Sequence, residues 1–153
     1  MELEEPEIIA QCTQLRDCLE LKADCNDTLG ALKARQLYLS VVSNIDDDLL
    51  EPIVARAGLH RYLDHWTSSE AAQSCKPHRH FFEICLEKSG LAPHEVLFVG
   101  DSPEHDIGGA AAGMCTALVI NGGIEPPPQS GRARAKPDFV IHNLSELLVL
   151  ALA

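Results

Sequence analysis

The chain has few basic residues, no paired cysteines and no long apolar run. Among its 153 residues, 12 are lysine or arginine and 23 are aspartate or glutamate, which gives a formal net charge of -11. This acidity argues against nucleic acid or a membrane surface as the main partner, because both bind through basic patches. The N-terminus has no apolar signal region and no segment reaches membrane-spanning length, so we expect a cytoplasmic protein.

The six cysteines include no Cys-x-x-Cys pair, so neither a disulfide framework nor a zinc site is predicted. Reduced thiols fit a cytoplasmic location. The chain shows no internal repeat, and its apolar content of 46% is that of a globular protein. One domain with a single core is therefore expected from the length.

Helix-like and strand-like segments alternate along the chain, which is typical of a parallel sheet with crossover helices. Strands are expected over residues 37–42, 63–67, 96–99, 116–120 and 138–141. Helices are expected over residues 7–21, 26–35, 46–57, 80–89, 106–113 and 144–150. Gly58 and Gly90 would end two of these helices, Asn143 would cap the last one, and residues 121–137 would form a loop. The pattern predicts a three-layer α/β fold with a mainly parallel, Rossmann-like sheet.

The most informative segment follows the apolar run of residues 96–99, which stops at Gly100-Asp101-Ser102. A second acid, Asp106, comes five positions after Asp101. Ligands of open α/β sheets bind beyond the carboxyl ends of the strands. Two carboxylates there suit a hard, oxygen-seeking cation such as Mg²⁺. Simple capping of the next helix by Asp101 or Ser102 is the alternative, but it does not account for both acids.

Two shorter motifs stand at similar places. Ser43-Asn44 follows a strand, and its hydroxyl and amide can donate hydrogen bonds to a phosphate oxygen, although a plain cap of the next helix is the alternative. Lys76-Pro77 precedes a helix, where the lysine can balance the carboxylates and contact a phosphoryl group. A solvated loop lysine is the alternative for Lys76. We expect His105, inside the acidic loop, to be exposed to solvent.

Taken in order, Ser43-Asn44, Lys76-Pro77 and Gly100-Asp101-Ser102 with Asp106 resemble the second, third and fourth motifs of the haloacid dehalogenase superfamily. The resemblance covers about residues 29–150 and favours the phosphatase-type branch. It implies Mg²⁺-dependent hydrolysis of a small phosphorylated substrate, in which an aspartate attacks phosphorus and water releases the phosphate.

The resemblance also implies a role for each matching residue. Ser43 would bind the phosphoryl oxygens together with the backbone of Asn44. Lys76 would be catalytic and phosphate-binding, since it would neutralise charge on the nucleophile and the phosphate. Asp101 would ligate Mg²⁺, and Asp106 would do so directly or through water.

The chain departs from the family at its beginning. The family opens with Asp-x-Asp-Gly-Thr at the end of an apolar strand, and nothing before Ser43 satisfies this pattern. The nearest string starts at Asp24, but Asn26 stands in place of the second acid and Asp27 in place of the glycine. We therefore do not expect Asp24 to be a nucleophile. Residues 1–25 would be the remnant of a helical cap or an N-terminal extension, and residues 26–153 the back half of the core.

A chain of this kind would lack the strand that lies between those ending at Ser43 and Gly100. The flanking strands would expose backbone groups, which is costly and favours association. The chain would be a truncated family hydrolase, which is the favoured interpretation, a half completed by another polypeptide, or a repurposed domain that pairs differently. Self-association or a completing partner chain is therefore expected. The sequence predicts a hydrolase that is inactive or weakly active alone, or alternatively a non-catalytic phosphate- and metal-binding or regulatory domain.

Overall fold

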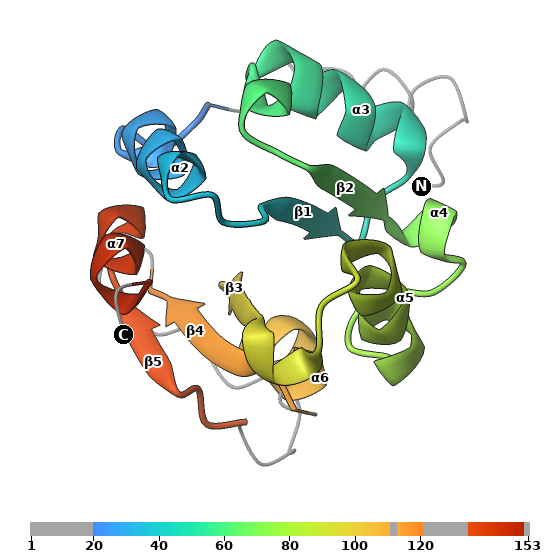
Figure 1. The fold of residues 1–153 in the computed structure, drawn as a ribbon. Coiled ribbons are helices and arrows are strands. Elements are labelled where there is room, and N and C mark those ends of the chain that lie inside the picture. The colour runs from blue at the N-terminus through green and yellow to red at the C-terminus, as the bar shows by residue number, and fades with distance from the viewer. Residues whose placement is uncertain (1–19, 111–112, 121–134, 152–153) are drawn as a thin grey trace, which may run out of the picture.

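The computed structural model describes residues 20–110, 113–120 and 135–151, which form an α/β fold of parallel strands and helices (Figure 1). The strands are β1 (Ser40–Ser43), β2 (His65–Ser68), β3 (Leu97–Gly100), β4 (Cys115–Val119) and β5 (Phe139–Ile141). The α-helices are α2 (Cys25–Ala34), α3 (Asp47–Arg56), α4 (Ser69–Ala72), α5 (Arg79–Ser89), α6 (Gly108–Ala110) and α7 (Leu147–Leu150). The short turns are η1 (Leu59–Arg61), η2 (Pro93–Glu95), the π-helical η3 (Pro103–Ile107) and η5 (Leu144–Glu146). The predicted fold class is confirmed.

The strands form two separate parallel sheets. β1 pairs with β2, with Ser40 opposite His65 at one end of the register and Ser43 opposite Ser68 at the other. The second sheet has the order β3-β4-β5. Within the described part of the chain, no strand lies between β1 and β3. The expectation that the chain lacks a middle strand stays a prediction.

Two helices end just before the glycines that the sequence indicates as helix stops. Gly58, with φ of 63°, follows the end of α3, and Gly90, with φ of 68°, follows the end of α5. This left-handed conformation terminates a helix at little cost only when the residue lacks a Cβ. Both predicted stops are confirmed.

The two sheets share apolar clusters even though their backbones do not pair. Leu39, just before β1, packs in the same cluster as Leu97 and Val99 of β3. Val42 of β1 packs against the cluster that holds Phe82 and Phe98. The rings of these phenylalanines meet edge to face, with their centroids 5.2 Å apart. Side-chain packing therefore connects β1 with β3 in the described structure.

One predicted helix start and one predicted side-chain cap are wrong. The helix expected from residue 106 begins earlier, at η3, because the Ser102 hydroxyl accepts a hydrogen bond from the His105 backbone N–H at 3.1 Å. Asn143 precedes η5, but its side chain makes no capping bond. The Glu146 carboxylate accepts from the backbone N–H of Asn143 at 2.9 Å, and Asp24 Oδ2 caps the turn by accepting from the Ser145 backbone N–H at 2.9 Å.

Several expectations concern residues that the structure does not describe. The helix expected over 7–21 lies outside, except for residues 20 and 21, which are not helical. Most of the 121–137 loop also lies outside. The division at residue 25 and the cytoplasmic location stay predictions. Across the described helices, none combines the length and apolar character that crossing a bilayer demands.

Candidate functional site

Three predicted site segments meet at the carboxyl ends of β1 and β3. Ser43 is the last residue of β1, and Gly100 is the last residue of β3. Lys76 lies in the loop that leads to α5, and it forms hydrogen bonds with residues that follow each of these strands. The three motifs that the sequence pattern singles out are thus joined into one site.

Asn44 binds the backbone of Lys76 through its side-chain amide. Asn44 Nδ2 donates to the Lys76 carbonyl oxygen at 2.9 Å, and Asn44 Oδ1 accepts from the Lys76 backbone N–H at 2.7 Å. The helix-capping alternative for Asn44 is wrong, because Asp46 occupies the N-cap position of α3. The sequence offered no signal for this contact, because the partner is a backbone group 32 residues away.

The Lys76 ammonium forms a largely buried ion pair with Asp106. Lys76 Nζ lies 2.6 Å from Asp106 Oδ1, and the exposed fractions of the two side chains are 14% and 5%. The ammonium also stands 5.9 Å from the centre of the Phe98 ring. Lys76 is therefore not a solvated loop lysine. It is held over the end of β3, with its positive charge balanced by one buried carboxylate.

Asp106 organises the loop after β3. Its Oδ2 accepts hydrogen bonds from the backbone N–H groups of Asp101 at 3.1 Å and Ser102 at 3.0 Å. With the bond from Lys76, this carboxylate has three donors. A Cβ on Gly100 would collide with the Asp106 side chain, so glycine is required there. Asp106 supports the loop, and its predicted role as a metal ligand stays a prediction.

The side chains of Asp101 and Ser43 have no hydrogen-bond partner among the described residues. Asp101 is exposed, and its carboxylate makes no hydrogen bond or ion pair with the described residues. The half-buried Ser43 hydroxyl likewise has no described partner. Within the described ranges, no cluster of three acidic, histidine or cysteine side chains is placed to hold a metal. Asp101 is thus the carboxylate available to a cation.

His105 contradicts the expectation that it is exposed. It is half-buried, and its Nδ1 lies 3.0 Å from the Ser102 hydroxyl oxygen. The same hydroxyl accepts from the His105 backbone N–H, so Ser102 and His105 close the turn at η3. Ser102 therefore acts as the helix cap that the sequence offered as an alternative, while Asp101 stays free.

Two other reactive groups are excluded as nucleophiles. Asp24 precedes α2 rather than ending a strand, and its Oδ2 accepts from the Ser145 backbone N–H at 2.9 Å, so it caps η5. Burial raises the pKa of the Cys85 thiol to about 11, against the opposing effects of Lys88 and Lys76. That thiol is protonated at neutral pH and is a poor nucleophile. The described cysteines are all free thiols, as predicted.

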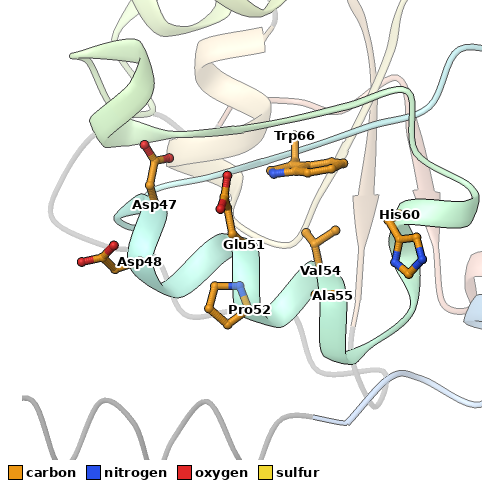
Figure 2. Close-up of a pocket in the computed structure, with 8 residues that line it drawn as sticks. All are labelled: Asp47, Asp48, Glu51, Pro52, Val54, Ala55, His60 and Trp66. Atoms are coloured by element: carbon orange, nitrogen blue, oxygen red, sulfur yellow. The ribbon is translucent and has the colours of Figure 1, made fainter.

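An open cavity of about 560 Å³ lies elsewhere, beside α3 and β2. Figure 2 shows the carboxylates of Asp47 and Glu51 on the same side of α3 as the Trp66 indole. None of the residues predicted from the motifs lines this cavity. This cavity and the motif site are therefore different surfaces.

Comparisons with known proteins agree with the motifs. The family model described as haloacid dehalogenase-like hydrolase matches residues 3–113. The phosphoglycolate phosphatase of Escherichia coli (strain K12) is 32% identical over 124 residues, which are 80% of this chain and 47% of that protein. The phosphoglycolate phosphatase of Salmonella choleraesuis is 30% identical over 122 residues, with the same coverage. The chain thus spans about half the length of these curated relatives.

Solved structures show the same fold. The L-2-haloacid dehalogenase from Xanthobacter autotrophicus aligns with a TM-score of 0.82 and 28% identity, covering 99% of this chain and 69% of that chain. A predicted phosphoglycolate phosphatase from Haemophilus somnus aligns with a TM-score of 0.79 and 26% identity, covering 98% of this chain and 69% of that chain.

Proposed function

Because the chain belongs to the haloacid dehalogenase-like hydrolases, we propose that it forms the phosphate-binding part of a Mg²⁺-dependent phosphate-monoester hydrolase. The substrate class is a small phosphorylated molecule, which accords with the phosphatase relatives. The observation that carries the proposal is the Lys76–Asp106 ion pair beside the free Ser43 and Asp101 side chains. One cation, one hydroxyl and one free carboxylate at the ends of parallel strands form a set of groups that can bind a phosphate and a metal.

Each residue has a task that its surroundings permit. The Lys76 ammonium has three N–H donors, and one of them contacts Asp106, so the others can reach a phosphoryl oxygen. The Ser43 hydroxyl can donate to a second oxygen because it has no described partner. Low exposure strengthens both interactions, since the effective dielectric falls as water is excluded.

Mg²⁺ fits the site through Asp101. When bound, the ion would supply positive charge that neutralises phosphate oxygens. The exposed Asp101 carboxylate offers the kind of oxygen ligand that Mg²⁺ takes, and Mg²⁺ keeps several waters when a protein supplies few ligands. Asp106 would act mainly by holding the backbone N–H groups of Asp101 and Ser102.

The nucleophile would come from polypeptide beyond the described residues. Asp24, the nearest match to the missing motif, is engaged with Ser145 and does not follow a strand. β1 and β3 each lie at an edge of their sheet in the described residues, and a further parallel strand can bind to these edges. We propose that a completing strand, from a longer form of the chain or from another polypeptide, brings the attacking carboxylate to Lys76.

Phosphate binding and turnover test this proposal separately. We expect the purified chain to bind inorganic phosphate in the presence of Mg²⁺ by calorimetry, and Lys76→Met to abolish that binding. Lys33→Met is the matched control, because Lys33 pairs with Asp64 at the same 2.6 Å on the exposed surface. An unchanged phosphate affinity in Lys76→Met would contradict the proposal.

The second candidate is a non-catalytic domain that binds phosphate and metal. It is favoured by the commitment of Asp106 to three donors, which leaves Asp101 as the free carboxylate of the described site. The test is turnover of 2-phosphoglycolate by the chain, alone and together with a polypeptide that supplies the missing strand. Mg²⁺-dependent turnover that Asp101→Asn abolishes supports the hydrolase. Phosphate binding without turnover in either form supports the binding domain.

A further inference from the structure

We propose that Asn44 is a positioning residue, whose side-chain amide fixes the backbone of Lys76 and thereby sets the Lys76 ammonium against Asp106. One amide group contacts both backbone polar groups of Lys76, as a donor at 2.9 Å and as an acceptor at 2.7 Å. This pairing uses the oxygen and at least one N–H of the Asn44 amide. The inference rests on the proposed function, because the placement of Lys76 matters there for binding phosphate.

A lysine in a loop needs support at both ends to stay in one place. Its four-carbon stem rotates freely, so an ion pair at the tip alone leaves the base of the side chain mobile. Asp106 holds the tip of Lys76 at 2.6 Å, and Asn44 holds its backbone. Lys76 is thereby placed between the end of β1 and the loop after β3, and Asn44 contributes without touching the ion pair.

The same contacts argue against a direct role of Asn44 on substrate. A side-chain amide has one oxygen and two N–H donors. The oxygen and one N–H are used on Lys76, so one N–H remains for any other partner. Direct contact with phosphate and positioning of Lys76 can be separated, because only positioning changes the ammonium when no phosphate is present.

The direct test is an NMR measurement of the Lys76 ammonium in the full chain without phosphate. The signal is assigned by its loss in Lys76→Met, and slow proton exchange is expected because the group is paired and 14% exposed. In Asn44→Ala we expect exchange to become about tenfold faster, which corresponds to the loss of one or two hydrogen bonds. Asn143→Ala is the matched control, because the Asn143 side chain makes no capping bond. An unchanged ammonium signal in Asn44→Ala would overturn the inference.

A milder variant keeps the test informative if Asn44→Ala folds poorly. Asn44→Asp retains an oxygen that accepts from the Lys76 N–H, but it cannot donate to the Lys76 carbonyl oxygen. We expect an exchange rate between those of the wild type and Asn44→Ala. An Asn44→Asp variant with the wild-type rate would also overturn the inference.

Phosphate binding then distinguishes this inference from the proposed function. Inorganic phosphate with Mg²⁺ is titrated into the wild type and Asn44→Ala, and the alanine variant is expected to bind about tenfold more weakly, in proportion to the loosened Lys76. If the wild type binds no phosphate, the proposed function fails, while the ammonium signal still decides the role of Asn44. Weakened phosphate binding with an unchanged ammonium would indicate direct contact and would overturn positioning.

Discussion

The two parallel sheets differ in how well their strands are covered. Four of the five residues of β4 are buried, whereas β3 has one buried residue and β1 has none. Strands of a parallel sheet with helices on both faces are normally buried throughout. β1 and β3 are also the edge strands that face each other across the two sheets, and their backbones do not pair with each other (Figure 1). These two edge strands are thus less buried than the central strand β4.

In each sheet, an aspartate just before one strand accepts a hydrogen bond from the backbone at the start of the neighbouring strand. Asp64, just before β2, accepts from the backbone N–H of Leu39 at 2.9 Å. Asp138, just before β5, accepts from the backbone N–H of Thr116 at 2.8 Å. Between the sheets, the polar connection runs at the opposite end, through Lys76. Structural contacts thus hold each sheet at the amino ends, and the site residues join the sheets at the carboxyl ends.

Removing the Asp106 carboxylate should cause the largest loss. Asp106→Ala leaves the mostly buried Lys76 ammonium without its counter-charge and two backbone N–H groups without an acceptor. We expect the free energy of unfolding to fall by about 3–5 kcal/mol, measured by urea denaturation. Glu83→Ala is the control, because its exposed pair with Arg79 should be worth about 0.5 kcal/mol or less. Equal losses would show that the link between the sheets is weak.

Gly100→Ala should cause the second largest loss of stability, because residue 100 at the end of β3 packs against Asp106, the partner of Lys76. The added methyl group would collide with the Asp106 side chain and displace it. We expect a loss of about 2–3 kcal/mol from overpacking, measured in the same way. Gly30→Ala in α2 is the matched control: its new Cβ would meet Tyr62 Cε1 at an ordinary 3.6 Å. That variant should gain about 0.5–1 kcal/mol, so a loss in both variants would contradict this account.

A buried threonine in each sheet allows their side-chain hydrogen bonds to be compared. The Thr116 hydroxyl in β4 donates to Asp138 Oδ2 at 2.9 Å and accepts from the Asp138 backbone N–H at 3.1 Å. Thr116→Val should cost about 1–2 kcal/mol. Thr67 in β2 has one longer contact, from Lys88 Nζ at 3.3 Å, so Thr67→Val should cost less. The loss of stability of each variant is measured by thermal unfolding. A larger loss for Thr67→Val than for Thr116→Val would contradict the view that side-chain hydrogen bonds stabilise the second sheet more than the first.

Low pH should reduce the stability of both sheets, because Asp64 in the first and Asp138 in the second lose their charge. Hydrogen bonds from Lys33 and the Leu39 backbone lower the pKa of Asp64, and bonds from Thr116 lower the pKa of Asp138. Each folded-state pKa lies below the unfolded value near 3.8. The stabilisation is therefore fully present above that value and is lost as the pH falls through the folded-state pKa.

The measurement is the free energy of unfolding against pH. The wild type should lose stability steeply below the ordinary aspartate pKa of about 4. A variant with both Asp64→Asn and Asp138→Asn should be less stable at neutral pH, with a shallower acid decline. An acid decline as steep as that of the wild type would show that these two carboxylates do not control the effect.

Local patterns predicted most of the elements because they depend on neighbouring residues. The alternation of apolar segments located all five described strands, and Gly58 and Gly90 marked two helix ends. The same logic failed where a distant group took over a local role. Asp24 caps η5 from 121 residues away, and Asn44 binds the backbone of Lys76, 32 residues away, rather than capping the next helix. Hydrogen bonds of this kind depend on which partner reaches the group first in space.

The order of Ser43, Lys76 and Asp101 was sufficient to predict the family and to place these residues in one site, because parallel strands bring their carboxyl ends to one edge. Only the tertiary structure decided what each polar atom binds. It paired Asn44 with the Lys76 backbone and committed Asp106 to three donors, while Asp101 stayed exposed. The reason is physical: a motif specifies which groups arrive at a site, whereas the distances between them depend on how the two sheets pack.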